Sequence, residues 1–258
     1  MDIQKHKAVE EDAWHSLKQF TAARIALGRT GNAIPLKELL KFKLAHAHAR
    51  DAVYAGLHTQ ELMQQLQQFN LPVYSLHSKA KDRNEYLLHP DLGRQLNDTS
   101  VQLLQNRSAS FDIVVVLADG LSATAINHHA VQLLQLLIPL LQQSKFSIAI
   151  TTAMQARVAI GDAIGSLMKA KLSLVLIGER PGLSAADSMG AYLTYNPTVG
   201  LTDESRNCIS NIRPEGIDYA KAATKIHYLI TASFRLQYSG VTLKDDELDF
   251  LEENKPEE

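Results

Sequence analysis

The spacing of apolar residues along the chain changes near residue 111. Before this point apolar residues recur every three or four positions, which predicts helices over residues 14–28, 35–56 and the glutamine-rich 59–69. The second of these helices carries one apolar stripe, made of Leu36, Leu39, Leu40, Leu44 and Ala47. A short β-like segment, residues 73–76, follows the helices. We therefore expect residues 1–98 to form a small helical domain.

After residue 111, continuous runs of valine, isoleucine and leucine replace the helical spacing. These runs have the length and branching of strands buried on both faces, and they lie at residues 112–118, 146–151 and 172–177. Helical patterns at residues 122–142 and 158–169 separate them. Strands that alternate with helices in this way predict parallel pairing with right-handed crossovers.

The second part of the chain thus predicts an α/β fold, a Rossmann-like open parallel sheet with helices on both faces. This domain covers residues 99–244, with a further strand at 189–195 and a last amphipathic helix at 217–238. Residues 245–258 are acidic and have the composition of a solvated tail.

Composition limits the partners and the compartment. A net charge of -2, from 26 basic and 28 acidic residues, gives no reason to expect nucleic acid or an anionic membrane as partner. The longest apolar stretch, residues 131–141, is shorter than the roughly 20 residues of a spanning helix, so no membrane segment is predicted. The single cysteine cannot form an internal disulfide, and the charged N-terminus differs from a secretory signal. A cytoplasmic, reducing location fits best.

Residues 178–216 are rich in turn-forming residues and in specific polar side chains, and they follow the third predicted strand. Ligands bind at the carboxyl edge of open α/β sheets, so we interpret this stretch as a binding loop. Glu179 lies where the strand ends, and its carboxylate either faces a ligand or pairs with Arg180 or another arginine. Cys208 is either a nucleophilic thiol or, as lone cysteines usually are, a small buried packing residue.

Other motifs leave the chemistry open. A Gly-x-Gly-x-x-Gly turn is missing after the first strand, where Asp119 and Gly120 either present a carboxylate and an amide to a ligand or form a tight turn with Ser122 as helix N-cap. Adjacent His128 and His129 are expected to be surface or interface histidines, so no metal site is predicted. Three classes survive: a catalytic subunit, a nucleotide- or S-adenosylmethionine-using enzyme, and a non-catalytic interaction subunit.

Four blocks of sequence narrow this choice. They are ARVAIGD at 156–162, GERPGLS at 178–184, DSMGAYLTYNP at 187–197 and RNCISNIRPEG at 206–216. Together with residues 24–53 they resemble the small subunits of ethanolamine ammonia-lyase. The resemblance implies a two-subunit, adenosylcobalamin-dependent enzyme that converts ethanolamine to acetaldehyde and ammonia by a radical mechanism. It also implies that the large subunit, a TIM barrel, binds ethanolamine, and that this chain alone is inactive.

The resemblance further implies which residues hold the cofactor. Val158, Glu179 and Cys208 match the family's cobalamin contacts, with Glu179 accepting hydrogen bonds from corrin amides and the other two supplying apolar contact. No catalytic residue is expected on this chain. The chain lacks a D-x-H-x-x-G sequence, so we expect base-on binding, with dimethylbenzimidazole still on cobalt. Members of the family often work inside a bacterial microcompartment, and the first twenty residues either dock on a shell protein or simply pack.

Overall fold

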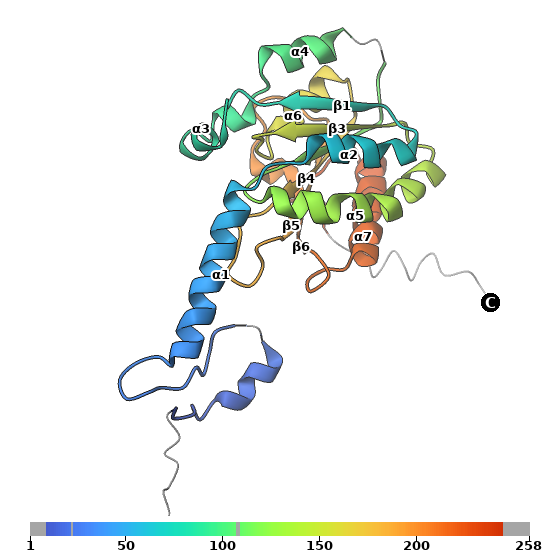
Figure 1. Cartoon of the computed structure of the whole chain (residues 1–258). Coiled ribbons are helices and arrows are strands. Elements are labelled where there is room, and N and C mark those ends of the chain that lie inside the picture. Colours follow the sequence, from blue (N-terminus) through green and yellow to red (C-terminus); the bar gives the residue numbers. More distant parts are fainter. Residues whose placement is uncertain (1–8, 22, 107–108, 245–258) are drawn as a thin grey trace, which may run out of the picture.

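The computed structural model describes residues 9–21, 23–106 and 109–244, so the predicted acidic tail lies outside the described residues. The described residues form one six-stranded sheet with the order β1-β3-β2-β4-β5-β6 (Figure 1). The first four of these pair in parallel, whereas β5 and β6 are antiparallel. The strands are β1 (Val73–His77), β2 (Ile113–Ala118), β3 (Ile148–Met154), β4 (Leu172–Gly178), β5 (Met189–Tyr195) and β6 (Arg206–Ile212).

Helices cover both faces of this sheet. The α-helices of the described residues are α1 (Leu36–Tyr54), which projects away from the sheet, α2 (Thr59–Leu66), α3 (Arg83–Leu88), α4 (Asp98–Gln105), α5 (Ala123–Gln143), α6 (Ile160–Leu167) and α7 (Tyr219–Leu236). Short 3-10 helices are His15–Phe20, Gln67–Phe69, Leu92–Arg94 and Asp203–Ser205. None of the described helices is long and apolar enough to cross a membrane.

Alternate residues of the central strands serve the two faces. In β2, Ile113, Val115 and Leu117 pack with α2, α5 and α7, whereas Val114 and Val116 pack with α4 and α6. All six residues of β2 are buried, which explains why its sequence is a continuous apolar run. The predicted α/β fold with helices on both faces is therefore confirmed.

The strand predicted at 189–195 is present as β5, but the interpretation of the rest of residues 178–216 as a loop is wrong in part, because β6 also lies within it. β6 is an edge strand with the sequence RNCISNI, and half of its pattern is polar because one of its faces is not covered by a helix. Periodicity that rewards apolar residues cannot detect such a strand. The sheet is consequently mixed, although mostly parallel.

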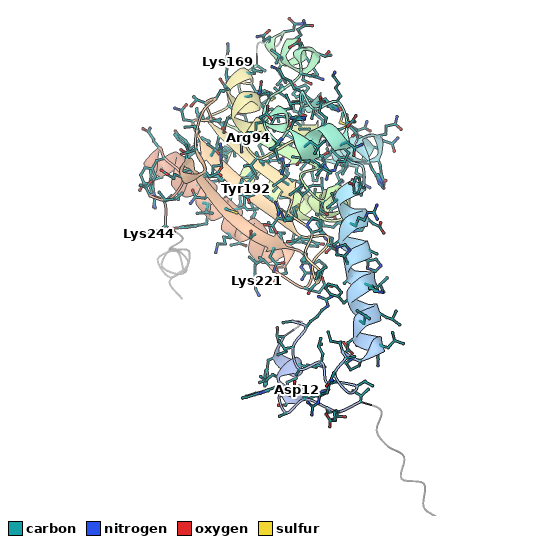
Figure 2. The ribbon with its side chains drawn as sticks, turned by 90° about the vertical axis from the view of Figure 1, so that its left-hand side faces the viewer. Asp12, Arg94, Lys169, Tyr192, Lys221 and Lys244 are labelled. Atoms are coloured by element: carbon teal, nitrogen blue, oxygen red, sulfur yellow. The ribbon has the colours of Figure 1, made fainter. Side chains whose placement is uncertain are left out.

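Helix α1 projects away from the sheet and carries residues 9–21 and 23–34 at its far end (Figures 1 and 2). The predicted stripe forms a helix as expected, but Leu36, Leu40 and Leu44 are exposed, and of the fully described α1 only Ala52 is buried. Residues 14–28 contain a short 3-10 helix in place of the predicted longer helix. The strand β1 pairs with β3 although it belongs to the predicted helical part. The boundary at residue 98 stays a prediction.

Candidate functional site

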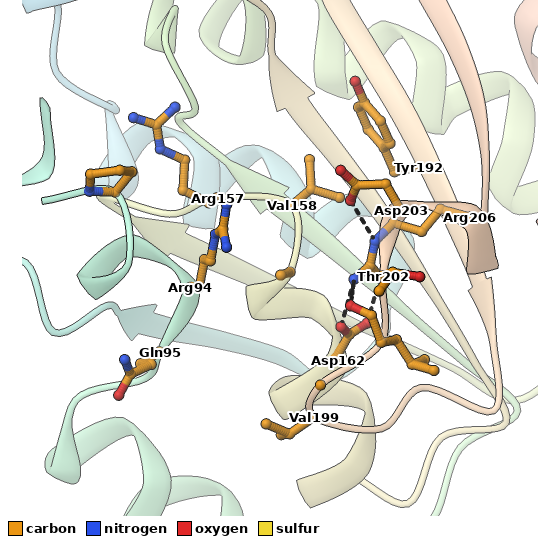
Figure 3. A pocket seen from close by; sticks show the side chains of 14 residues that line it. Arg94, Gln95, Arg157, Val158, Asp162, Tyr192, Val199, Thr202, Asp203 and Arg206 are labelled. Atoms are coloured by element: carbon orange, nitrogen blue, oxygen red, sulfur yellow. Dashed lines mark hydrogen bonds and ion pairs between the residues drawn. The ribbon is translucent and has the colours of Figure 1, made fainter.

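The parallel strands β2, β3 and β4 end at one edge of the sheet, and two adjoining cavities lie there. The smaller has a volume of about 420 Å³ and is lined by both Val158 and Glu179. The larger, of about 780 Å³, shares Arg157, Val158 and Tyr192 with it (Figure 3). The structure therefore brings together two of the three predicted contact residues, which belong to the turns after β3 and β4.

The turn after β2 is structural. The Asp119 carboxylate is buried and accepts hydrogen bonds from the backbone N–H groups of Gln155 (2.8 Å) and Ala156 (2.9 Å). Burial raises the pKa of Asp119, and these hydrogen bonds act against that rise. Gly120 has φ +57°, and a Cβ on it would lie 2.2 Å from the Gly178 carbonyl oxygen. The tight-turn alternative is confirmed.

Ser122 occupies the N-cap position of α5, but its side chain makes no capping hydrogen bond. Its hydroxyl donates instead to the Ala186 carbonyl, at 2.8 Å. The predicted N-cap position is therefore correct, but the predicted capping hydrogen bond is wrong, because the Ser122 hydroxyl binds the loop that precedes β5.

An uncovered part of the sheet face continues from the cavities across β5 and β6. Tyr192 on β5 lines both cavities and is the direct partner of Cys208 on β6. The backbone of Gly190 leaves room for Glu179, since a Cβ there would lie 3.1 Å from the Glu179 Oε1 atom. Val158, Glu179 and Cys208 thus surround Tyr192, a residue that sequence analysis treated only as part of a strand.

Glu179 is half-buried and held in place by β6 and the start of β5. Its carboxylate accepts hydrogen bonds from the hydroxyls of Ser188 and Ser210 and from the Asn211 backbone N–H, at 3.1 Å. Among the described residues no arginine forms an ion pair with it, so the alternative in which Glu179 pairs with Arg180 or another arginine is wrong. Because a carboxylate can accept about four hydrogen bonds, capacity for a ligand donor remains.

Cys208 is exposed, so the prediction of a small buried packing residue is wrong. Atoms crowded around the sulfur raise the pKa of the Cys208 thiol, and the hydroxyls of Tyr192 and Ser210 offset part of this effect. Burial, together with the neighbouring Cys208, likewise raises the pKa of Tyr192. A thiol with a raised pKa is a poor nucleophile at neutral pH, which does not support the catalytic alternative.

A buried ion pair fixes the far wall of the larger cavity. Arg206 donates to both carboxylate oxygens of Asp162, at 2.6 and 2.7 Å, and to Thr194 at 3.0 Å (Figure 3). Burial acts to lower the pKa of Arg206, but the bonds and charge of Asp162 raise it overall. Sequence analysis missed this pair, since its members are 44 positions apart and neither position carries a local signal.

A second polar cluster holds the loop after Glu179. His129 is buried, and its ring nitrogens lie 2.8 Å from the Tyr219 hydroxyl and 3.3 Å from Asp187. The expectation of surface or interface histidines holds for His128, which is exposed, but is wrong for His129, which is buried within this chain. Atoms of both histidines and Asp187 lie within 4.8 Å of one another, yet Arg213, at 3.9 Å from Asp187, disfavours a cation there.

The sequence as a whole is similar to known proteins. Residues 11–244 match the family model "Ethanolamine ammonia-lyase light chain (EutC)". The chain belongs to this family. A protein of Xanthomonas campestris pv. campestris named "Ethanolamine ammonia-lyase small subunit" is 50% identical over 240 residues, covering 91% of this chain and 88% of that protein. Proteins of the same name from Pseudomonas fluorescens and Pseudomonas aeruginosa are 47% and 46% identical, covering 95% and 96% of this chain and 91% and 93% of theirs.

Membership in the ethanolamine ammonia-lyase light-chain family confirms the resemblance seen in the four sequence blocks. The matched region contains the cavities, the uncovered sheet face and helix α1. The chain is accordingly a subunit of a carbon-nitrogen lyase. The roles of Val158, Glu179 and Cys208 stay predictions.

Proposed function

We propose that this light chain binds adenosylcobalamin around Tyr192 and presents it to the large subunit of ethanolamine ammonia-lyase. The complex converts ethanolamine to acetaldehyde and ammonia. The observation that carries the proposal is the convergence of Val158, Glu179 and Cys208, which come from three separate sequence blocks, beside two adjoining cavities. Convergence of residues far apart in sequence at a strand edge is typical of a ligand site.

The residues present fit a corrin ring. A corrin has a broad apolar face with amide side chains around its rim, and the site offers apolar surface from Val158, Ile177 and Tyr192. Glu179, already fixed by three hydrogen bonds, supplies an acceptor for a corrin amide. When bound, the cofactor supplies a cobalt-carbon bond that breaks to give the radical. This chain's residues hold and orient the cofactor and keep water from one of its faces.

Helix α1 supports the need for a partner. Its exposed apolar residues adjoin the loop after Glu179, because Leu44 and His48 line a cavity of about 290 Å³ together with Leu183 and Ala186. A protein that covers the cofactor edge would therefore also reach α1. We propose that the large subunit buries this apolar surface, which monomeric proteins rarely leave open.

Cobalamin is proposed to bind base-on. No histidine is among the residues that line the two cavities of the described structure, so this chain offers no imidazole there to replace dimethylbenzimidazole. An electron spin resonance spectrum of the Co(II) state, recorded with nitrogen-15 histidine in the protein, tests this. We expect no histidine-dependent change in the nitrogen coupling, and a change would refute base-on binding.

For location, we propose the cytoplasm and, within it, a bacterial microcompartment. Trp14 and Phe20, which are 67% and 78% exposed near the far end of α1, suit docking on a shell protein. A fluorescent protein fused to residues 1–20 should then collect in microcompartments. Diffuse fluorescence in cells that assemble shells would contradict this role of the segment.

The proposed function is tested by co-expression with a large subunit. We expect a complex that takes up cobalamin and releases ammonia only when ethanolamine and adenosylcobalamin are added, while each chain alone is inactive. Ammonia release by the isolated light chain, or a complex that takes up no corrinoid, would overturn the proposal.

A further inference from the structure

The larger cavity carries positive charge that the corrin contacts do not use. Its walls include three arginines and two aspartates. Both aspartates bond to Arg206, through Asp162 at 2.6 Å and Asp203 at 3.4 Å. Arg94 and Arg157 stand on the other side of the cavity (Figure 3). Within the described ranges 9–21, 23–106 and 109–244, neither of these two forms an ion pair with a carboxylate.

The guanidinium group of Arg157 stacks on a neighbouring ring, and one of its N–H donors is unused. Its guanidinium carbon lies 4.3 Å from the centre of the Tyr86 ring, and its buried Nε has no hydrogen-bond partner in the described structure. An unsatisfied buried donor carries a free-energy cost, so a ligand acceptor that reaches it would be favoured. The Arg157 backbone N–H donates to the Gly93 carbonyl at 2.8 Å, which keeps this residue beside Arg94.

We propose that Arg94 and Arg157 bind the phosphodiester of the nucleotide arm of cobalamin. The inference rests on the proposed function, since it concerns the same cofactor. Arginine binds phosphate oxygens with charge-assisted, often bidentate hydrogen bonds. The nucleotide arm leaves the corrin on its lower face, the side of dimethylbenzimidazole. The adenosyl group is on the opposite face, which must point toward the large subunit, where the substrate binds. The lower face and its phosphate therefore belong to this chain, and the larger cavity adjoins the corrin contacts through Val158 and Tyr192.

The test compares two corrinoids on the complex with the large subunit. Cyanocobalamin has the phosphate, and cobinamide lacks the whole nucleotide arm. We expect Arg157→Gln to weaken cyanocobalamin binding about tenfold or more, in line with the loss of a charge-assisted hydrogen bond, and to leave cobinamide binding unchanged. Arg94→Gln should act in the same direction with a smaller effect because Arg94 is exposed. Arg157→Lys keeps the charge and should recover part of the affinity.

A second readout does not depend on cobinamide affinity. The phosphorus-31 resonance of bound cyanocobalamin should shift between the wild-type complex and Arg157→Gln. The matched control is Arg235→Gln, since the exposed Arg235 of α7 lines neither cavity. Equal weakening of both corrinoids by Arg157→Gln, or an unchanged phosphorus resonance, would overturn the phosphate site and leave the proposed function standing. A wild-type complex that binds neither corrinoid would instead overturn the proposed function.

Discussion

Helices α1 and α5 have similar lengths, 19 and 21 residues, and opposite surroundings. Both sequences are rich in leucine. Yet α5 buries eleven residues between the sheet and α7, whereas the fully described α1 buries only Ala52. The difference lies in what covers each apolar face within this chain. An apolar stripe in the sequence indicates that one face of a helix becomes buried. It does not indicate whether the element that covers this face belongs to the same polypeptide.

The largest expected effect separates these two helices directly. Leu134→Asp places an unpaired charge in the core under α5 and should lower the free energy of unfolding by more than about 4 kcal/mol. Leu40→Asp alters an exposed position of α1, so the isolated chain should change by less than about 0.5 kcal/mol while association with the large subunit weakens. Urea unfolding and size-exclusion chromatography measure the two effects. If both variants lowered the free energy of unfolding equally, the comparison between α1 and α5 would be contradicted.

The next effect compares a buried with an exposed ion pair. Arg206→Met leaves Asp162 charged and unpaired, which should cost about 3–5 kcal/mol of stability. Lys171→Met removes the exposed partner of Asp112 and should cost much less. Denaturant unfolding gives both values. Adding Asp162→Leu to Arg206→Met should restore part of the stability, and a double variant no better than the single one would contradict the buried-charge explanation.

A smaller effect concerns the cofactor contact. Glu179→Gln keeps the size of the side chain and removes its charge, so we expect cobalamin affinity in the complex to fall about three- to tenfold with little change in the KM for ethanolamine. Spectroscopic titration and steady-state kinetics measure these quantities, with the exposed Glu61→Gln as control. A raised KM with unchanged cobalamin binding would show that the carboxylate serves the substrate.

The smallest effect is a pH dependence of stability. Burial lowers the pKa of His129 and of His227 in the folded chain, although Asp187 opposes this for His129. The unfolded chain, with histidine pKa values of about 6.5, then binds more protons than the folded chain as the pH falls. Stability should therefore drop from about pH 6.5 toward the folded pKa, and Tm should be lower at acidic than at neutral pH. His129→Gln should reduce this slope, and an identical slope would argue against the assignment.

The central strands could be predicted from sequence because a strand that is buried on both faces has a continuous run of apolar residues. β2, β3, β4 and β5 all appear within a few residues of their predicted ends. β6 could not be predicted in this way. Three of its residues, the buried Arg206 and the exposed Cys208 and Ser210, belong to the candidate site, and their polarity resembles that of a loop.

The site was predictable only in part. Val158, Glu179 and Cys208 followed from the family resemblance, and the position of two of them after strands agreed with general rules for open sheets. The place of Tyr192 in the site was not predicted, because an aromatic residue inside a strand cannot be distinguished from a core residue by its sequence pattern alone. The polar pairs that fix the walls of the cavities were also not predicted, because contacts between residues tens of positions apart leave no local signal in the sequence.

Alkylation of Cys208, the single cysteine of the chain, tests most directly whether this surface holds the cofactor. Iodoacetamide modification of the Cys208 peptide would be followed by mass spectrometry in the complex with the large subunit, with and without cyanocobalamin. If the corrin lies against Tyr192 and Cys208, the cofactor should slow modification about tenfold beyond any protection by the large subunit, since access controls thiol reactivity. Equal rates with and without bound cyanocobalamin would contradict the account.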